Sequence, residues 1–304
     1  MSVEINRRVF VKCAGQTTSL LVAGGTLLAA CGGKVSTLGS SSSSTLQSAQ
    51  GLKQSGLLQW GATSQGGAPY VYPDPSDSTL LVGFEYEIAV ALSQWLEIQQ
   101  KEVETDYSQL DEALQAGKFD VILNGWESTT ERQKSELFTQ SYYRYGQQIV
   151  VRANDQRFSS RTANDVLGLK ALEGFTVGTG AGLKAADLLS TDSQITLKTY
   201  DPALPFDDLD RGRIDAVLID LPVVAYYVLG AGAGAQADKK LRLIGQPFAL
   251  GDYVIALKKA APGATLLLKM LDQAITELKN NGTLHNILAK WQLWNDQQAS
   301  IGTI

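Results

Sequence analysis

Apolar residues fall into two kinds of repeat along most of the chain. Short apolar runs, typical of buried strands, occur at 57–63, 119–123, 147–152, 175–177, 214–219, 241–244 and 253–257. Apolar residues spaced three and four positions apart predict helices over 85–96, 110–114, 183–189, 266–279 and 283–291. Gly117 is suited to end the second of these helices, and Pro222 to begin a further one. Strands that alternate with helices in this way predict an α/β fold with mostly parallel sheets.

The first thirty residues follow a different pattern, that of an export signal. Arg7, Arg8 and Lys12 make the start basic, and an apolar stretch of eleven residues follows at 20–30. A membrane-spanning helix needs about 20 apolar residues, so this stretch predicts a signal peptide over 1–30 instead. The paired arginines resemble a twin-arginine signal, which directs the export of folded proteins.

The apolar stretch ends in the sequence LAAC, which resembles a bacterial lipobox with Cys31 as the lipidated first residue of the mature chain. Residues 36–50 are rich in serine, with five in a row at 40–44. Such a composition cannot bury an apolar core and predicts a flexible tether. We therefore expect residues 31–51 to hold the protein beside a membrane, on its extracytoplasmic side.

Composition narrows the classes of function. The chain has 26 Lys and Arg against 31 Asp and Glu, a net charge of −5, and no basic run of the kind that follows a nucleic-acid backbone. Removal of residues 1–30 takes away three basic residues and one acidic residue, which leaves a net charge of −7. With one histidine and two cysteines a metal cage of these residues is excluded, and no metal or other cofactor is expected. The histidine, His285, stands beside Leu284 and Ile287 on the last predicted helix, where packing accounts for it.

Residues 124–132, directly after a predicted strand, carry the first sign of a binding site. Ser128 and Glu131 form a capping box, which predicts that a helix begins there, and free N–H groups at a helix start bind anions. Arg132 would stand in the first turn, where a cation opposes the helix dipole; this placement suits a site that holds a carboxylate bidentately. The alternative is a surface arginine paired with Glu131 or Glu136.

The motif at 83–92, GFEYEIAVAL, resembles the signature of family 3 extracellular solute-binding proteins, the amino-acid receptors of ABC importers. Tyr86 departs from the aliphatic residue that is usual at its position. Further matches follow in the family's order at 110–121, 129–132, 138–143, 212–217, 281–283 and 290–291. Together they extend the resemblance over residues 57–296, essentially the whole body of the mature chain.

The resemblance implies a two-lobed α/β fold of the type II periplasmic-binding-protein kind, with two crossing strands as the hinge. Lobe 1 would comprise residues 52–146 and 247–297, lobe 2 residues 147–246, and residues 298–304 would form a C-terminal tail. The family pattern also implies that a free amino acid binds between the lobes and passes to the membrane permease of an ABC importer. We expect a monomer that uses neither nucleic acid nor cofactor.

Four residues of the first lobe match ligand contacts of the family. Arg132 matches the arginine that grips the ligand α-carboxylate. Gly125 and Thr129 match residues that touch the α-amino and carboxylate groups, and Tyr107 matches an aromatic residue that packs on the ligand side chain.

In the second lobe, the glycine-rich turn at 178–182 matches a second carboxylate-binding turn, with Thr179 and Gly182 as its contacts. Glycines there allow backbone amides to approach an anion; the plain alternative is a loop with conformational glycines. Asp220, at the end of a predicted strand, matches the aspartate that pairs with the ligand ammonium. It could also cap the helix that begins near Pro222, and the two roles are compatible.

Two departures from the family pattern bear on the choice of ligand. Glu127 replaces the usual Ser or Thr, and Gly67 stands where an aromatic wall is common, so that Tyr70 or Tyr72 is a candidate substitute. The site would then hold one guanidinium against two carboxylates, those of Glu127 and Asp220. Since a buried unpaired carboxylate is costly, this balance favours a polar or cationic ligand side chain.

Glu127 admits two other interpretations. It could point outward to Lys134 or water, or it could serve as general acid in an enzyme of the cyclohexadienyl-dehydratase kind on the same scaffold. A single carboxylate without a positioned partner does not make an acid–base site, and a fold does not fix a function, so no catalytic residue is expected. A third class, a ligand-sensing module for a receptor, would need a partner chain to carry the signal.

The lipobox provides a test of anchoring. Cys31→Ser should move the protein from the membrane fraction to the soluble fraction after cell fractionation, because the thiol that accepts the lipid is gone. Ser40→Ala in the neighbouring segment serves as the control and should leave the distribution unchanged. Retention of Cys31→Ser in the membrane fraction would contradict the lipoprotein interpretation.

Overall fold

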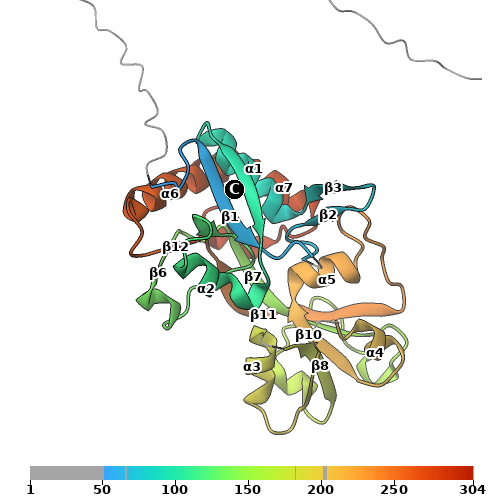
Figure 1. Ribbon diagram of the computed structural model, residues 1–304. Coiled ribbons are helices and arrows are strands. Elements are labelled where there is room, and N and C mark those ends of the chain that lie inside the picture. The colour runs from blue at the N-terminus through green and yellow to red at the C-terminus, as the bar shows by residue number, and fades with distance from the viewer. Residues whose placement is uncertain (1–50, 66, 182, 201–203, 304) are drawn as a thin grey trace, which may run out of the picture. The chain divides into compact units, whose positions relative to one another are not determined.

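Two five-stranded sheets organise the part of the chain that the computed structural model describes, which is residues 51–65, 67–181, 183–200 and 204–303 (Figure 1). These residues belong to one compact unit. The predicted signal peptide, Cys31 and the serine-rich segment lie outside them. Among the described residues, no helix is both long enough and apolar enough to cross a membrane.

The first sheet has the strand order β4-β1-β5-β12-β6. β1 runs parallel to β4 and β5, whereas β12 runs antiparallel to β5 and β6. The strands are β1 (Leu57–Ala62), β4 (Gln99–Glu104), β5 (Val121–Ile122), β6 (Glu136–Phe138) and β12 (Ala256–Lys258). A separate hairpin pairs β2 (Tyr72–Asp74) with β3 (Asp77–Val82).

Helices cover both faces of the first sheet. Successive residues of a strand point to opposite faces. Accordingly Val121 and Leu257 join the buried cluster that includes the long helices, while Ile122 and Ala256 join the cluster of the short helix α2. The helices are α1 (Phe84–Trp95), α2 (Leu110–Gln115), α6 (Ala264–Asn280) and α7 (Thr283–Lys290).

The second sheet has the order β11-β7-β10-β8-β9, with β10 parallel to β8 and antiparallel to β7. Its two faces also carry separate cores, since Leu218 belongs to one buried cluster and its neighbours Val217 and Ile219 to the other. The strands are β7 (Tyr143–Arg152), β8 (Thr176–Gly180), β9 (Thr196–Tyr200), β10 (Ala216–Asp220) and β11 (Leu241–Tyr253), and the helices are α3 (Lys184–Ser190), α4 (Phe206–Asp210) and α5 (Leu221–Tyr227). Single 3-10 turns complete the described chain: η1 (Tyr107–Gln109), η2 (Arg132–Lys134), η3 (Gln156–Phe158), η4 (Leu169–Leu172) and η5 (Asp296–Ile301).

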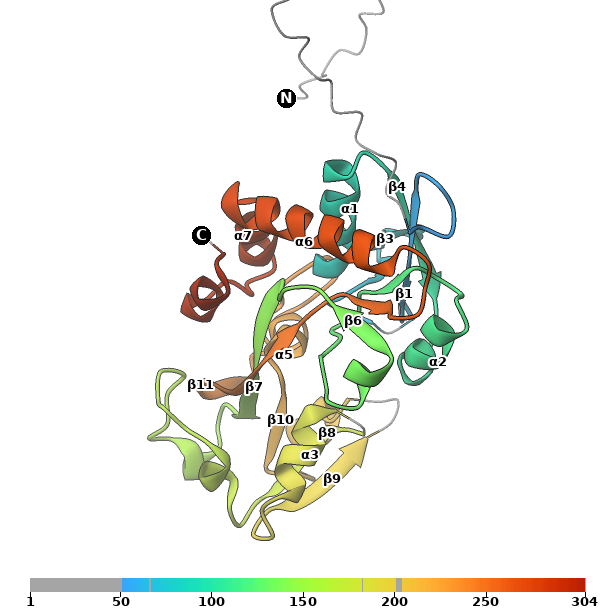
Figure 2. The same cartoon turned by 90° about the vertical axis from the view of Figure 1, so that its left-hand side faces the viewer.

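Two long strands, β7 and β11, take part in both halves of the molecule (Figure 2). They pair antiparallel from Tyr143 and Tyr253 at one end to Arg152 and Leu241 at the other, with irregular register between Ile244 and Gly251. At the first end the two tyrosines lie in the core of the first sheet, whereas further along the strands contribute to the cores of the second sheet. The predicted α/β fold with two crossing strands is confirmed. The prediction of mostly parallel sheets is wrong, because β12 pairs antiparallel in the first sheet and β7 and β11 pair antiparallel in the second.

The elements that the sequence did not predict are mainly polar edge strands. β4 has the sequence QQKEVE and β9 the sequence TLKTY, so neither has the apolar run of a central strand. The strand predicted at 119–123 is reduced to β5, two residues long. The predicted helix end at Gly117 and helix start at Pro222 are confirmed. Gly117 adopts a φ of +69° after α2, and Pro222 lies in the first turn of α5.

Candidate functional site

The loop that follows β5 is held by a buried carboxyl group. Gly125 has a left-handed φ of +58° and donates its N–H to Glu85 Oε1 at 2.7 Å, and Tyr142 donates its hydroxyl to the same oxygen. Glu85, in the first turn of α1, is fully buried, and burial raises its pKa to about 7. The N–H of Gly125, a predicted ligand contact, is therefore already used inside the protein.

The prediction of a helix start at Ser128 and Glu131 is wrong, because only the 3-10 turn η2 follows. The Glu131 carboxylate bonds Lys134 instead of reaching back along the chain, and Thr129 Oγ1 accepts the Arg132 N–H at 3.2 Å. Strand β6 begins one residue after η2, which leaves no length for an α-helix. Thr129 thus caps the turn that carries Arg132.

The guanidinium of Arg132 stacks on the indole of Trp126, 3.4 Å from the ring centroid, and its Nη1 donates to the Glu127 carbonyl at 2.9 Å. The alternative ion pair with Glu131 or Glu136 is wrong, since the former bonds a lysine and the latter accepts the Trp126 indole N–H. No carboxylate among the described residues forms an ion pair with Arg132. Most of the five N–H donors of the guanidinium therefore remain for a ligand carboxylate.

Tyr107, at the start of η1, lies against the edge of the same indole, with ring centroids 5.5 Å apart, and is 39% exposed. Desolvation raises the pKa of its hydroxyl to about 12; the charge of Arg132 lowers this pKa, while Glu127 and Asp220 raise it. Charged groups from three separate parts of the sequence thus act on one hydroxyl. Tyr107, Glu127, Arg132 and Asp220, four of the eight predicted ligand contacts, therefore lie near enough for their charges to act on one another.

Glu127 faces the crossing strands. Its carboxylate accepts a hydrogen bond from the hydroxyl of Tyr145, and its backbone forms a β-bridge with Tyr253. Lys134 pairs with Glu131. The interpretation in which Glu127 points outward to Lys134 is therefore wrong.

Asp220 occupies the N-cap position of α5, but its side chain makes no capping bond to that helix, all of which is described. Its carboxylate instead accepts from Gln147 Nε2 at 2.5 Å and from the hydroxyl of Tyr253. Burial raises the pKa of Asp220 to about 6, the two hydrogen bonds lower it, and the charge of Glu127 raises it. The alternative role of its side chain as a helix cap is wrong, because both carboxylate oxygens bond residues of the crossing strands.

The crossing strands supply site residues that the sequence did not identify, namely Tyr145, Gln147 and Tyr253. Tyr145 stacks on Tyr253 with ring centroids 4.5 Å apart and an interplanar angle of 15°. The hydroxyls of Tyr253 and Tyr70 lie 3.0 Å apart, which brings one of the two candidate wall residues into this group. Positions 145 and 147 share one face of β7, and this period of two was the signal available in the sequence.

The glycine-rich turn of the second sheet is described only in part. β8 continues to Gly180 and α3 begins at Lys184, while Gly182 lies outside the described residues. Thr179 is fully buried in β8, and its Oγ1 has no hydrogen-bond partner within the described part of the chain. Gln147 Oε1 is also buried and has no hydrogen-bond partner within the described part of the chain, and Gln147 itself bonds Asp220.

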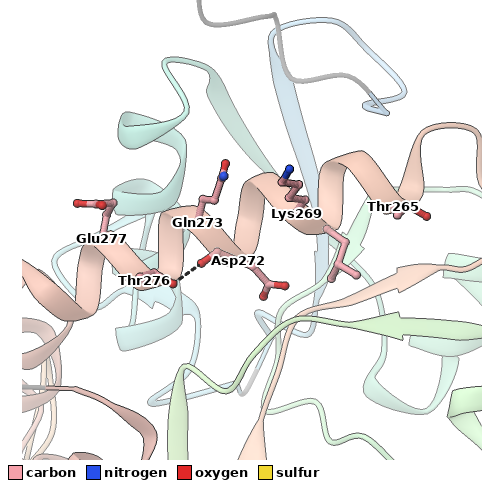
Figure 3. A pocket seen from close by; sticks show the side chains of 7 residues that line it. Thr265, Lys269, Asp272, Gln273, Thr276 and Glu277 are labelled. Atoms are coloured by element: carbon pink, nitrogen blue, oxygen red, sulfur yellow. Dashed lines mark hydrogen bonds between the residues drawn. The ribbon is translucent and has the colours of Figure 1, made fainter.

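A groove of about 410 Å³ follows one side of α6, remote in sequence from these residues (Figure 3). It is lined by Thr265, Leu268, Lys269, Asp272, Gln273, Thr276 and Glu277. Gln140 already bonds Asp272 Oδ1 and Thr276 Oγ1, each at 2.7 Å, and all the lining comes from one helix. We assign no ligand to it. Within the described residues no three His, Cys, Asp or Glu side chains gather to hold a metal ion.

The match of this sequence to a known protein family identifies its class. The model of bacterial extracellular solute-binding proteins, family 3, matches residues 61–293, which is most of the chain. The chain is a family 3 solute-binding protein.

Characterised relatives of this solute-binding protein agree with the assignment. The L-cystine-binding protein TcyJ of Escherichia coli strain K12 is 30% identical over 217 residues, covering 71% of this chain and 76% of TcyJ. The ABC transporter glutamine-binding protein GlnH of Bacillus subtilis strain 168 is 27% identical over 270 residues, covering 87% of this chain and 92% of GlnH.

Solved structures confirm the predicted two-lobed fold. A mutant of ArgBP from T. maritima superposes with a TM-score of 0.62 at 27% identity, covering 78% of this chain and 95% of that chain. An ancestral arginine-binding protein bound to arginine gives a TM-score of 0.61 at 28% identity, covering 78% of this chain and 98% of that one. This solute-binding protein therefore has the type II fold expected from its sequence.

The buried Glu85 predicts a pH-dependent stability. A carboxyl whose pKa is raised on folding, here from about 4.5 to about 7, favours the folded state at low pH and loses that advantage as pH rises between these values. Glu85→Gln should therefore gain about 3 kcal/mol relative to wild type between pH 4 and pH 8. Urea unfolding at a series of pH values measures this difference.

Glu112→Gln, an exposed position on α2, is the matched control and should show no such change. A Glu85→Gln curve that runs parallel to the wild-type curve over this pH range would show that Glu85 titrates normally.

Proposed function

We propose that this protein captures one α-amino acid outside the cytoplasm and delivers it to an ABC importer. The observation that carries the proposal is the grouping of Arg132 with two carboxylates, those of Glu127 and Asp220. Among the described residues, the Arg132 guanidinium forms no ion pair with a carboxylate. Arg132 precedes β7 in the first lobe, and Asp220 ends β10 of the second sheet. An α-amino acid carries a carboxylate and an ammonium group, which complement these charges.

The carboxylate end of the ligand would bind Arg132. Its guanidinium is held flat on Trp126 and uses Nη1 on the Glu127 carbonyl, so its other edge can form a bidentate contact. The Thr129 hydroxyl lies next to Arg132 in the chain fold, and Thr179 offers a further hydroxyl from the second sheet. Gly182, in the glycine-rich turn at 178–182, would be a further contact of the ligand carboxylate.

The ammonium end would bind Asp220. An ammonium group has three N–H donors and no acceptor. Asp220 supplies two carboxylate oxygens, and Gln147 Oε1 adds an acceptor that has no partner in the described structure. A ligand ammonium would favour the ionised form of Asp220, whose pKa lies near 6 without it.

The ligand side chain would pack on Tyr107 and face Glu127. The charge balance supports a cationic or donor-rich side chain, and so do relatives described as binding arginine, glutamine and cystine. A specific contact supports the second candidate, a neutral side chain: Tyr145 already donates a hydrogen bond to Glu127. The same contact gives Glu127 a binding partner rather than a catalytic one, and we assign no enzymatic activity.

The arrangement of the whole chain extends this proposal. Residues 52–146 with 247–297 would form lobe 1 and residues 147–246 lobe 2, so that the ligand lies where β7 and β11 pass between them. A lipid on Cys31 and the serine-rich segment would keep the monomer close to its permease in the membrane.

A thermal-shift screen of the twenty amino acids tests the function. A ligand that binds only the native state stabilises it by about 2.7 kcal/mol at a hundredfold excess over Kd. We expect the largest shifts with L-arginine, L-lysine or L-glutamine. Absence of any shift would contradict the proposed function, whereas tight binding of aspartate or glutamate alone would contradict only the side-chain preference.

Removal of either charged group tests the site. Arg132→Ala and Asp220→Asn should each weaken binding by about 2–5 kcal/mol, because the ligand charge that the residue pairs with is left unpaired in a desolvated site. Calorimetry would record this as a rise in Kd of roughly 30-fold to several thousandfold. Arg211→Ala, an exposed arginine 3.9 Å from Asp207, is the matched control. Binding by both site variants within threefold of wild type would show that the site is elsewhere.

A further inference from the structure

A buried carboxylate lies behind the residues proposed to bind the ligand. Glu136 of β6 is 2% exposed, and its Oε2 accepts the indole N–H of Trp126, also 2% exposed, at 3.0 Å. Glu136 Oε1 has no hydrogen-bond partner among the described residues. Burial raises the pKa of this carboxyl to about 7, Asp111 of α2 raises it further, and Arg132 lowers it. Lys258, opposite Glu136 in the β12–β6 pair, instead bonds the Gln115 carbonyl.

The indole of Trp126 joins this carboxylate to the ligand contacts. One face carries the Arg132 guanidinium at 3.4 Å from the centroid, and Tyr107 lies against the ring at an angle of 62°. Two of the residues proposed to touch the ligand thus rest on one fully buried ring. A buried indole whose N–H is hydrogen-bonded is held in one orientation. The position of Trp126 therefore sets the positions of Arg132 and Tyr107.

We propose that Trp126 and Glu136 are positioning residues that set the place of Arg132 and Tyr107 and thereby the affinity of the site, without touching the ligand. The proposal rests on the proposed function, in which Arg132 holds the ligand carboxylate. A free arginine side chain would lose its rotamer freedom on binding; one already stacked on an aromatic ring has lost it beforehand. A cation on a π face is held without an opposing charge, so its donors stay open to a carboxylate.

The presence of a carboxylate at 136 supports a role beyond filling space. A buried carboxyl group with an unpartnered oxygen destabilises the fold, and an apolar side chain would fill the same volume without that penalty. What the carboxylate provides is an acceptor for the indole N–H. Loss of this acceptor would leave Trp126 free to turn, and Arg132 with it.

Calorimetry with L-arginine as the probe tests whether Trp126 acts through Arg132. Trp126→Leu should weaken binding by about 3- to 30-fold in the wild-type background and by clearly less in the Arg132→Ala background, where only the placement of Tyr107 is left to lose. Trp126→Phe, which keeps an aromatic face, should restore most of the affinity. Trp60→Leu is the matched control, since Trp60 is equally buried, its indole N–H bonds Gln100, and it lies in the core on the other face of the sheet.

Substitutions at 136 separate the acceptor from the charge. Glu136→Gln keeps an oxygen that can accept the indole N–H and should bind L-arginine within threefold of wild type, whereas Glu136→Leu should weaken binding severalfold. The proposal would be overturned if Trp126→Leu lowered the affinity for L-arginine equally with and without Arg132, or if Trp60→Leu lowered it by the same factor. Trp126 and Glu136 would then only stabilise the fold.

Nuclear magnetic resonance of the ligand-free protein gives an independent readout. The indole N–H signal of Trp126, identified by its absence in Trp126→Phe, should titrate with a midpoint near pH 7 and lose this titration in Glu136→Gln. The Nε–H signal of Arg132 should carry a ring-current shift that Trp126→Leu removes. If both signatures are present but wild type does not bind L-arginine, the proposed ligand is wrong and the positioning pair stands. If they are missing, the pair is refuted whatever the ligand.

Discussion

The antiparallel pairing of β7 with β11 is the constraint on which the rest of the structure depends. Buried backbone N–H and C=O groups must find partners, so two strands that pass between two cores must stay paired at both ends. They do so from Tyr143 with Tyr253 to Arg152 with Leu241, and the irregularities in register are confined to the middle of β11. Every donor that the crossing strands offer to the site follows from this register.

Neutral groups hold the charged residues of the site. Tyrosine hydroxyls bond Glu127 and Asp220, an amide adds a second bond to Asp220, and an indole face carries Arg132. Such partners stabilise each charge without neutralising it, which distinguishes this site from the surface, where Arg144 pairs with Asp252 through two hydrogen bonds. The charges are therefore kept in place and kept available for a ligand of opposite charge.

The sequence was informative wherever a single residue or a local period decides the structure. Central strands, the long helices, Gly117 and Pro222 could be predicted because burial and backbone dihedrals act locally. The capping box at Ser128 failed because β6 begins too soon after it, a limit imposed by the sheet rather than by the segment.

The partners of the site residues could not be predicted for a related reason. Gln147 and Tyr253 reach Asp220 only through the pairing of strands that lie about a hundred residues apart in the chain. The same holds for Glu136, which was considered only as an ion-pair partner of Arg132 and instead accepts the indole N–H of Trp126. Arg132, Tyr107 and Asp220 were recognised through resemblance to a family, and Glu127 as a departure from its pattern. No local pattern in this sequence would have grouped them.

The place of Glu85 has a consequence for how such proteins diverge. Glu85, the acidic residue in the motif that resembles the family signature, bonds the backbone of Gly125 and is fully buried. The side chains at 127 and 129 can therefore be exchanged while the support that Glu85 gives the loop is unchanged. A scaffold built in this way separates the residues that support the loop from those that select the ligand. One backbone can then be adapted to different ligands by a few substitutions in a single loop.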